Sequence, residues 1–174
     1  MIKPNWKRIA GIHSLEDGTL GAVWLAHDRD TDVVHVYDCA LFKNEVLAVI
    51  SEGLNARGRS IPVAWGPSAK ELAQALLERG CQTLPEPVSD TPEMAEVLSR
   101  EVDARLRSGR LKVDKRLSEW LDEYRSFYRE DSQVPRDSHP LMSATRFSIA
   151  SLQYGRAEQS FSTAKLKYPK RAIA

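Results

Sequence analysis

The chain has 174 residues, with 25 Lys and Arg against 24 Asp and Glu, so its net charge is +1. This length is typical of one domain and excludes two of full size. A hydrophobic fraction of 42% and a mean hydropathy of −0.42 exclude a disordered chain. No apolar run reaches the roughly 20 residues of a membrane helix, and the N-terminus has no signal-peptide core, so we expect no membrane association and a cytoplasmic protein. Cys39 and Cys81 form no disulfide framework and are expected to be small core residues.

Charge is unevenly distributed along the chain. The segment from Tyr154 to the C-terminus carries a net charge of +4, so the first 153 residues carry −3. This excludes a body that binds nucleic acid through its bulk charge. We expect a domain over residues 1–153 and a basic C-terminal tail over residues 154–174, which lacks a sustained periodicity and is expected to be mobile or to dock on a partner.

The first third of the chain predicts an antiparallel meander. Runs of β-forming residues over 8–13, 20–27 and 33–39 are separated by turn-forming stretches. The acidic stretch 28–32 resembles the start of a calcium loop, but Val33 and Cys39 stand where that loop needs Gly and Glu. We therefore expect a hairpin turn there.

The remaining chain alternates helical and extended patterns. A helix is predicted over 44–50 and a buried strand over 61–65. Ser68 and Glu71 form a capping box for the next helix, which Gly80 ends, and a short strand over 81–84 follows. Thr91-Pro92 begins a helix that ends at Gly109.

After Gly109 the pattern predicts an extended segment over 110–113 and two more helices. The first carries an apolar stripe at helical spacing: Leu117, Trp120, Leu121, Tyr124 and Tyr128. The second starts at His139-Pro140. The order of elements predicts an α/β fold whose mixed sheet joins a three-strand antiparallel meander to parallel strands and is flanked by helices.

Several motifs, taken in order, resemble the C-terminal nuclease domain of phage terminase large subunits. They are Arg8-Ile9-Ala10-Gly11-Ile12, Ala22-Val23-Trp24, residues 27–32, Val36-Tyr37-Asp38, residues 61–65, residues 108–113, residues 120–125 and residues 141–147. The resemblance covers residues 8 to about 152 and implies a ribonuclease-H-like fold. It also implies a role in genome packaging, in which the family cuts concatemeric DNA.

The resemblance places the family's metal-binding acids at three positions. Such sites need acids, because carboxylate oxygens balance the charge of the two divalent cations that activate water. Here His13 stands at the first position and Ser68 at the second, while Asp137 lies within a residue or two of the third. We therefore expect an impaired nuclease domain that acts by binding double-stranded DNA, a terminase, a portal or a host protein, with no cofactor.

Three alternatives remain open at this point. An active endonuclease could use a rearranged site of Asp137, His139, His13 and Asp17 with Mg²⁺ or Mn²⁺. The chain could also be a remnant of a decayed prophage. Without the resemblance, His13 is typical of a hydrogen-bonded, half-buried strand residue and Ser68 of a helix N-cap.

A basic cluster in the second half of the chain gives a candidate nucleic-acid surface, and the basic tail could also supply affinity for DNA. Its members are Arg107, Arg110, Lys112, Lys115 and Arg116. They predict a phosphate-binding track or, with equal weight, a solvated helix face. The sequence contains no GxxxxGK[ST] loop, so this chain alone is not expected to be a packaging motor.

Overall fold

The computed structural model of the protein describes residues 1–127 and 133–158. Its strands are β1 Lys7–Ser14, β2 Thr19–Asp28, β3 Val33–Lys43, β4 Pro62–Trp65, β5 Gln82–Thr83 and β6 Leu111–Val113. Its α-helices are α1 Leu47–Ala56, α2 Lys70–Glu78, α3 Pro92–Arg107, α4 Ser118–Ser126 and α5 Pro140–Ala150. Two 3-10 turns, η1 Pro67–Ala69 and η2 Leu152–Tyr154, complete the described elements.

The six strands form one mixed sheet in the order β5-β4-β1-β2-β3-β6. Strands β1, β2 and β3 pair antiparallel, whereas β4 pairs with β1, β5 with β4 and β6 with β3 in parallel. The predicted α/β fold, a meander extended by parallel strands, is therefore confirmed. The acidic stretch 28–32 forms the β2–β3 hairpin turn, as predicted, with Asp32 in the left-handed region at a φ of 53°.

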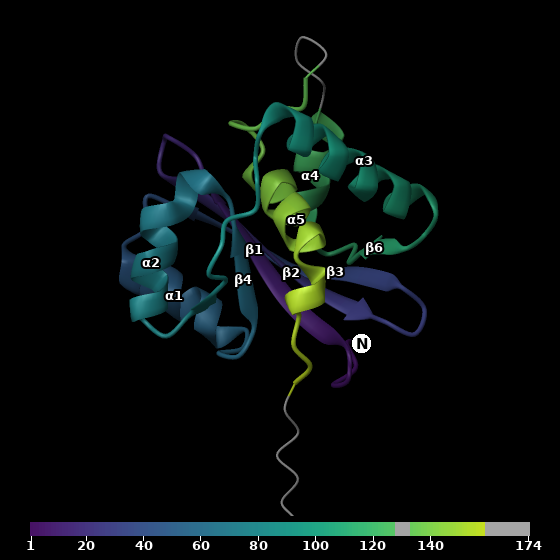
Figure 1. The fold of residues 1–174 in the computed structure, drawn as a ribbon, viewed down its shortest axis with the longest axis horizontal. Coiled ribbons are helices and arrows are strands. Elements are labelled where there is room, and N and C mark those ends of the chain that lie inside the picture. The colour runs from purple at the N-terminus through teal and green to yellow at the C-terminus, as the bar shows by residue number, and fades with distance from the viewer. Residues whose placement is uncertain (128–132, 159–174) are drawn as a thin grey trace, which may run out of the picture.

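The sheet separates two apolar cores (Figure 1). Because successive strand residues point to opposite faces, Ile9 and Ala10 of β1 enter different cores. Ile9 packs in the core that contains Phe147 of α5, and Ala10 packs in the core that contains Leu54 of α1 and Leu76 of α2. Helices α3, α4 and α5 thus cover one face, and α1 and α2 cover the other.

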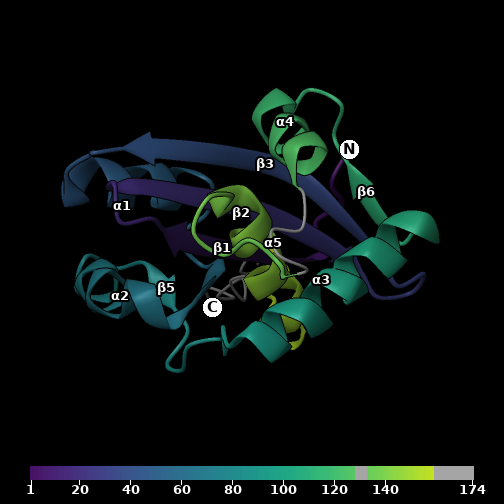
Figure 2. The ribbon, with the colours of Figure 1, turned by 90° about the horizontal axis from the view of Figure 1, so that it is seen from above.

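Helix α5 is the centre of its layer, and residues 140–149 are all buried (Figure 2). It packs across β1, β2 and β4 and contacts α3 and α4. A Cβ atom on Gly11 would lie 2.2 Å from the carbonyl oxygen of Ala144, and one on Gly21 would lie 2.7 Å from the backbone of Pro140. Glycine at these two strand positions therefore allows the helix to approach the sheet closely.

Some local expectations are wrong. Helix α1 runs from Leu47 to Ala56 instead of beginning at residue 44. Ser68 is exposed and lies inside η1, and no side-chain hydrogen bond caps α2, so the predicted capping box does not form. The Pro67–Ala69 turn delays the helix until Lys70, which moves the serine hydroxyl away from the first helical amides. Trp120 is buried as expected, but Tyr124 is 42% exposed.

The start of the predicted tail is paired with β1. The backbones of Arg8 and Arg156 exchange hydrogen bonds of 2.8 and 3.0 Å, and the Arg8 guanidinium forms a 2.8 Å ion pair with Glu158. The rest of the predicted tail, 159–174, lies outside the described residues, as does Tyr128 of the apolar stripe. Cys39 and Cys81 are buried free thiols, as expected. None of the helices in residues 1–127 and 133–158 is long and apolar enough to cross a membrane.

Candidate functional site

Two of the positions singled out by the sequence, His13 and Ser68, lie where β1 and β4 end. These two strands are parallel, with Ile12 opposite Trp65, so both finish at the same edge of the sheet. His13 is the next residue of β1, and Ser68 lies in the turn that follows β4. Helix α5 crosses this edge on one face, and Gly66 allows close approach of its Phe147 ring.

His13 is held inside the protein rather than presented to solvent. It is only 2% exposed, and its ring packs edge-on against Phe147 with 5.7 Å between ring centroids. Its Nε2 lies 2.9 Å from the carbonyl oxygen of Arg136. Because a carbonyl oxygen only accepts hydrogen bonds, Nε2 carries the proton, and Nδ1 is buried without a partner among the described residues.

Burial is the main cause that lowers the pKa of His13, and the nearby guanidinium of Arg146 acts in the same direction. The charges of Asp90 and Asp137 and the bond to Arg136 oppose this shift. The imidazole is therefore neutral at pH 7, and it supplies no negative charge at the position where the resemblance expects a carboxylate.

Arg146 of α5 is a buried charged group close to His13. It is 2% exposed, and its Nη2 donates to Ser143 Oγ at 3.1 Å and lies 3.5 Å from Asp90 Oδ1. Burial lowers the pKa of Arg146, while Asp90 raises it. Asp90 in turn accepts a 2.7 Å hydrogen bond from Arg136 Nη1 through its backbone carbonyl. We call His13, Asp90, Arg136 and Arg146 the sheet-edge cluster.

The other predicted site residues have different surroundings. Asp137 is exposed and acts on His13 only through its charge. Ser68 is also exposed. Asp17 lies in the β1–β2 turn, where it accepts a 2.9 Å hydrogen bond from the Thr19 amide, and the bonds to Thr19 lower the pKa of this carboxyl.

Both ring nitrogens of His139 are already bonded. Nδ1 lies 2.7 Å from Ser138 Oγ, and Nε2 lies 3.2 Å from the carbonyl oxygen of Ser126. The ring also packs edge-on against Phe127, with 5.4 Å between centroids. His139 therefore ties the end of α4 to the start of α5.

The side chains at this edge do not fit a pair of divalent cations. Within residues 1–127 and 133–158, no three His, Cys, Asp or Glu side chains lie close enough to hold a metal ion. Asp137, His139, His13 and Asp17 are thus not gathered into one ligand set. A cation beside His13 would meet a neutral imidazole and the charges of Asp90, Asp137 and Arg146. The guanidinium of Arg146 offsets one of these two carboxylates, so little negative charge is left to compensate two divalent cations.

Three of the five predicted nucleic-acid-binding residues are in ion pairs. Arg107 lies 2.9 Å from Asp103, Arg110 lies 3.0 Å from Asp32, and Arg116 lies 2.6 Å from Asp114. Lys112 and Lys115 are exposed on and just after β6, and neither forms an ion pair with a described residue. Their ammonium groups are the free charges of this surface.

Sequence reasoning missed Asp90 and the role of Arg146. Arg146 stands in a helix whose neighbours are almost all apolar or small, and a lone charge in such a helix needs a buried partner. That pattern was available in the sequence. Asp90, which just precedes α3, has no comparable pattern, because only the tertiary structure places it against α5.

A second missed carboxylate is Glu123 of α4. Its Oε2 accepts hydrogen bonds from the amides of Leu141 at 2.9 Å and Met142 at 3.1 Å, so it caps the first turn of α5 from a neighbouring helix. Burial raises the pKa of Glu123 to about 7, although these two amide bonds lower it. This carboxylate is engaged in holding α5 and is not presented to a ligand.

No family model and no curated protein matches the sequence. Solved structures do match the fold. The P22 large terminase nuclease domain is similar over 91% of this chain and 87% of its own, with a TM-score of 0.81 and 17% identity. The nuclease domain of the large terminase from bacteriophage SPP1, solved with bound Mn, is similar over 84% and 86%, with a TM-score of 0.65 and 14% identity.

A large terminase from a thermophilic bacteriophage matches over 88% of this chain with a TM-score of 0.71 and 14% identity. This chain spans only 41% of that longer protein. These identities are too low to transfer an activity, but the agreement in architecture is close over nearly all of the described residues. The chain therefore has the α/β, ribonuclease-H-like fold of terminase large-subunit nuclease domains.

Proposed function

We propose that this chain is a nuclease-like domain of phage DNA packaging that binds double-stranded DNA and does not cut it. The observation that carries this proposal is the state of His13. It occupies the strand position where the resemblance expects the first metal-binding acid, and it is buried, neutral and bonded to the Arg136 carbonyl.

The charge around His13 supports the same conclusion. Two-metal hydrolysis needs several carboxylates at one place. The sheet-edge cluster has one carboxylate, Asp90, whose Oδ1 lies 3.5 Å from Nη2 of Arg146. Ser68 supplies no charge at the second expected position. We therefore derive no hydrolytic step at this edge.

Free positive charge on another surface supports DNA binding. Lys112 and Lys115 are exposed, and the paired guanidinium groups of Arg107 and Arg116 are each 80% exposed, so phosphates can compete for them. Such contacts carry no sequence information. We expect binding to duplex DNA that is independent of sequence and sensitive to salt.

The competing proposal is an active endonuclease with a rearranged site that includes Asp137. One experiment separates the two. The purified chain is incubated with supercoiled plasmid and Mg²⁺ or Mn²⁺, and the same protein is tested for retention of linear duplex DNA at increasing salt. We expect retention that falls with salt and no nicking. Nicking that disappears in Asp137→Ala would overturn our proposal and favour the endonuclease.

A paired variant tests the binding surface. Lys112→Ala with Lys115→Ala should weaken retention at every salt concentration and lower the salt slope by about 1 for each phosphate that the variant no longer neutralises. The control is Lys43→Ala with Lys70→Ala, which removes the same charge from exposed positions on β3 and α2. Equal weakening in the control would show that bulk charge, rather than this surface, carries the binding.

A further inference from the structure

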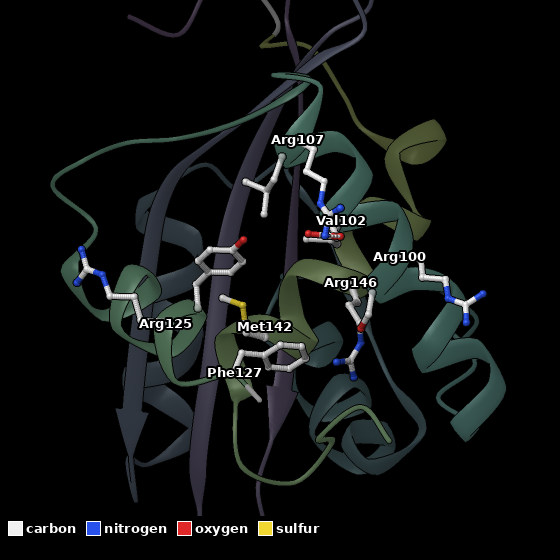
Figure 3. Close-up of a pocket in the computed structure, with 11 residues that line it drawn as sticks. Arg100, Val102, Arg107, Arg125, Phe127, Met142 and Arg146 are labelled. Atoms are coloured by element: carbon white, nitrogen blue, oxygen red, sulfur yellow. Dashed lines mark ion pairs between the residues drawn. The ribbon is translucent and has the colours of Figure 1, made fainter. Parts of the chain in front are cut away.

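A pocket of about 480 Å³ lies between α3, α4 and α5 (Figure 3). Its apolar lining comes from all three helices and from the residue that follows α4: Val102, Leu106, Tyr124, Phe127 and Met142. In Figure 3, Phe127, Met142 and Arg146 lie near the centre, whereas Arg100 and Arg125 extend outward on opposite sides. The pocket thus has an apolar interior with arginines around it.

The charged lining is mostly positive. Arg100, Arg107, Arg125 and Arg146 line the pocket together with a single carboxylate, that of Asp103. Arg100 pairs with Glu96 and Arg125 with Asp122, but these two acids do not line the pocket. Both guanidinium groups are more than 70% exposed, so a ligand carboxylate can compete for them.

Two lining residues carry buried polar atoms that have no partner among the described residues. They are Nε and Nη1 of Arg146 and the hydroxyl of Ser99. Native proteins leave few buried polar groups unpaired, and a buried guanidinium is among the most costly of them. Arg146 is only 2% exposed and retains two free donors, which indicates that the pocket receives an acceptor group from outside this chain.

We propose that this pocket binds a short segment of a partner protein in which a carboxylate stands next to an aromatic or branched apolar side chain. The carboxylate is held by Arg146 and the outer arginines, and the apolar side chain packs on Tyr124, Phe127 and Met142. Aromatic residues, Met and Arg are enriched at protein interfaces, and Lys is depleted there, which is the composition of this lining.

Nucleic acid fits this pocket less well. Protein–DNA interfaces are polar and follow an extended line of phosphates, whereas this pocket is concave and has five apolar lining residues. Burying those residues favours a ligand with an apolar side chain. The unpaired donors of Arg146 are shielded from solvent, so a ligand reaches them by displacing a side chain that lines the pocket. Met142 is the most adaptable of these side chains.

The test uses the whole chain and a displayed library of random short peptides. Selection on the wild-type protein should enrich peptides with Asp or Glu beside an aromatic or branched apolar residue. Synthetic copies of these peptides should bind Tyr124→Asp at least about tenfold more weakly, because the new carboxylate repels theirs at the mouth of the pocket. Arg146→Met should weaken binding as well, because it removes the free donors.

The matched control is Leu77→Asp, which places the same charge on an exposed apolar position of α2 on the other side of the sheet. It should leave peptide binding unchanged. No enrichment, enrichment of basic or purely apolar peptides, or equal loss in the control would overturn the proposal. Duplex DNA binding that is lost in Tyr124→Asp would assign the pocket to nucleic acid instead. Peptide binding does not depend on nicking or DNA retention, so either proposal can fail alone.

Discussion

The two faces of the sheet differ in the polar side chains that they bury. On the α1 and α2 face, the buried residues are almost all apolar, and the only buried polar side chain of the two helices, Ser51, is bonded to a backbone carbonyl. On the α5 face, His13 and Arg146 are buried and carry polar atoms that find no partner in residues 1–127 and 133–158. The hydroxyl of Tyr37, which packs on the α1 and α2 face, is also buried without a partner among the described residues. The two faces therefore differ in that the α5 face buries the guanidinium of Arg146, which is more costly to leave unpaired than a hydroxyl.

The polar groups of α5 that serve packing can be told apart from those that do not. Thr145 accepts a 2.9 Å hydrogen bond from the Trp120 indole, and Ser148 donates to the Ala144 carbonyl. These groups are satisfied within the chain and stabilise the layer. Among the described residues, Arg146 has only Ser143 and a distant Asp90 for its five donors, so its environment is incomplete there.

The largest expected effect is a difference in stability between two variants, each of which removes one partner of the Asp90–Arg146 pair. Asp90→Asn should destabilise the protein by about 2 kcal/mol, because it leaves a buried guanidinium without its carboxylate. Arg146→Met should cost less, because the carboxylate that it leaves unpaired is 15% exposed and can be hydrated, whereas the guanidinium left by Asp90→Asn is 2% exposed. Urea unfolding of both variants measures the difference.

A matched ion pair on the α1 and α2 face provides the control. Arg57 and Asp38 lie 2.8 Å apart, but both side chains are about one-third exposed, so Asp38→Asn should cost no more than about 1 kcal/mol. The comparison fails if Arg146→Met proves as destabilising as Asp90→Asn, because Arg146 would then be a satisfied structural residue.

A second test concerns pH and Glu123, which holds the start of α5. Its pKa is raised from an ordinary 4.5 to about 7, so between these values the folded state keeps a proton that the unfolded state has lost. This group alone makes stability fall as pH rises from about 4.5 to 7. Glu123→Gln should remove that contribution.

The measurement is the difference in unfolding midpoint between wild type and Glu123→Gln across this pH range. Using the difference cancels the opposite contribution of His13, whose lowered pKa makes stability rise with pH up to about 6.5. A difference that stays constant between pH 4.5 and 7 would contradict the assignment.

The smallest expected losses of stability concern the starts of two helices, α3 and α2. Thr91 accepts a 3.3 Å hydrogen bond from the Met94 amide at the start of α3, so Thr91→Ala should cost about 1 kcal/mol. Ser68 makes no capping bond to α2, so Ser68→Ala should leave the thermal unfolding midpoint unchanged. A substantial loss in Ser68→Ala would restore the capping role that its sequence pattern predicts.

The sequence by itself determined the order of elements and the mixed sheet, because strand alternation, helical stripes and glycine stops are local patterns. Gly80 and Gly109 stand at helix ends with positive φ values of 83° and 72°, as their positions predict. The resemblance also pointed to His13, which lies at the end of β1. These features depend on neighbours in the chain, so the sequence contains them.

Only the tertiary structure decided which polar groups meet at the end of β1. Asp90 and Arg146 are 56 positions apart, and His13 and Arg136 are 123 apart, yet they form one cluster. Their juxtaposition follows from α5 packing against Gly11 and from α3 crossing α5, neither of which has a local pattern. The pocket beside Arg146 arises from the same packing, because its walls come from three helices that only the folded chain brings together.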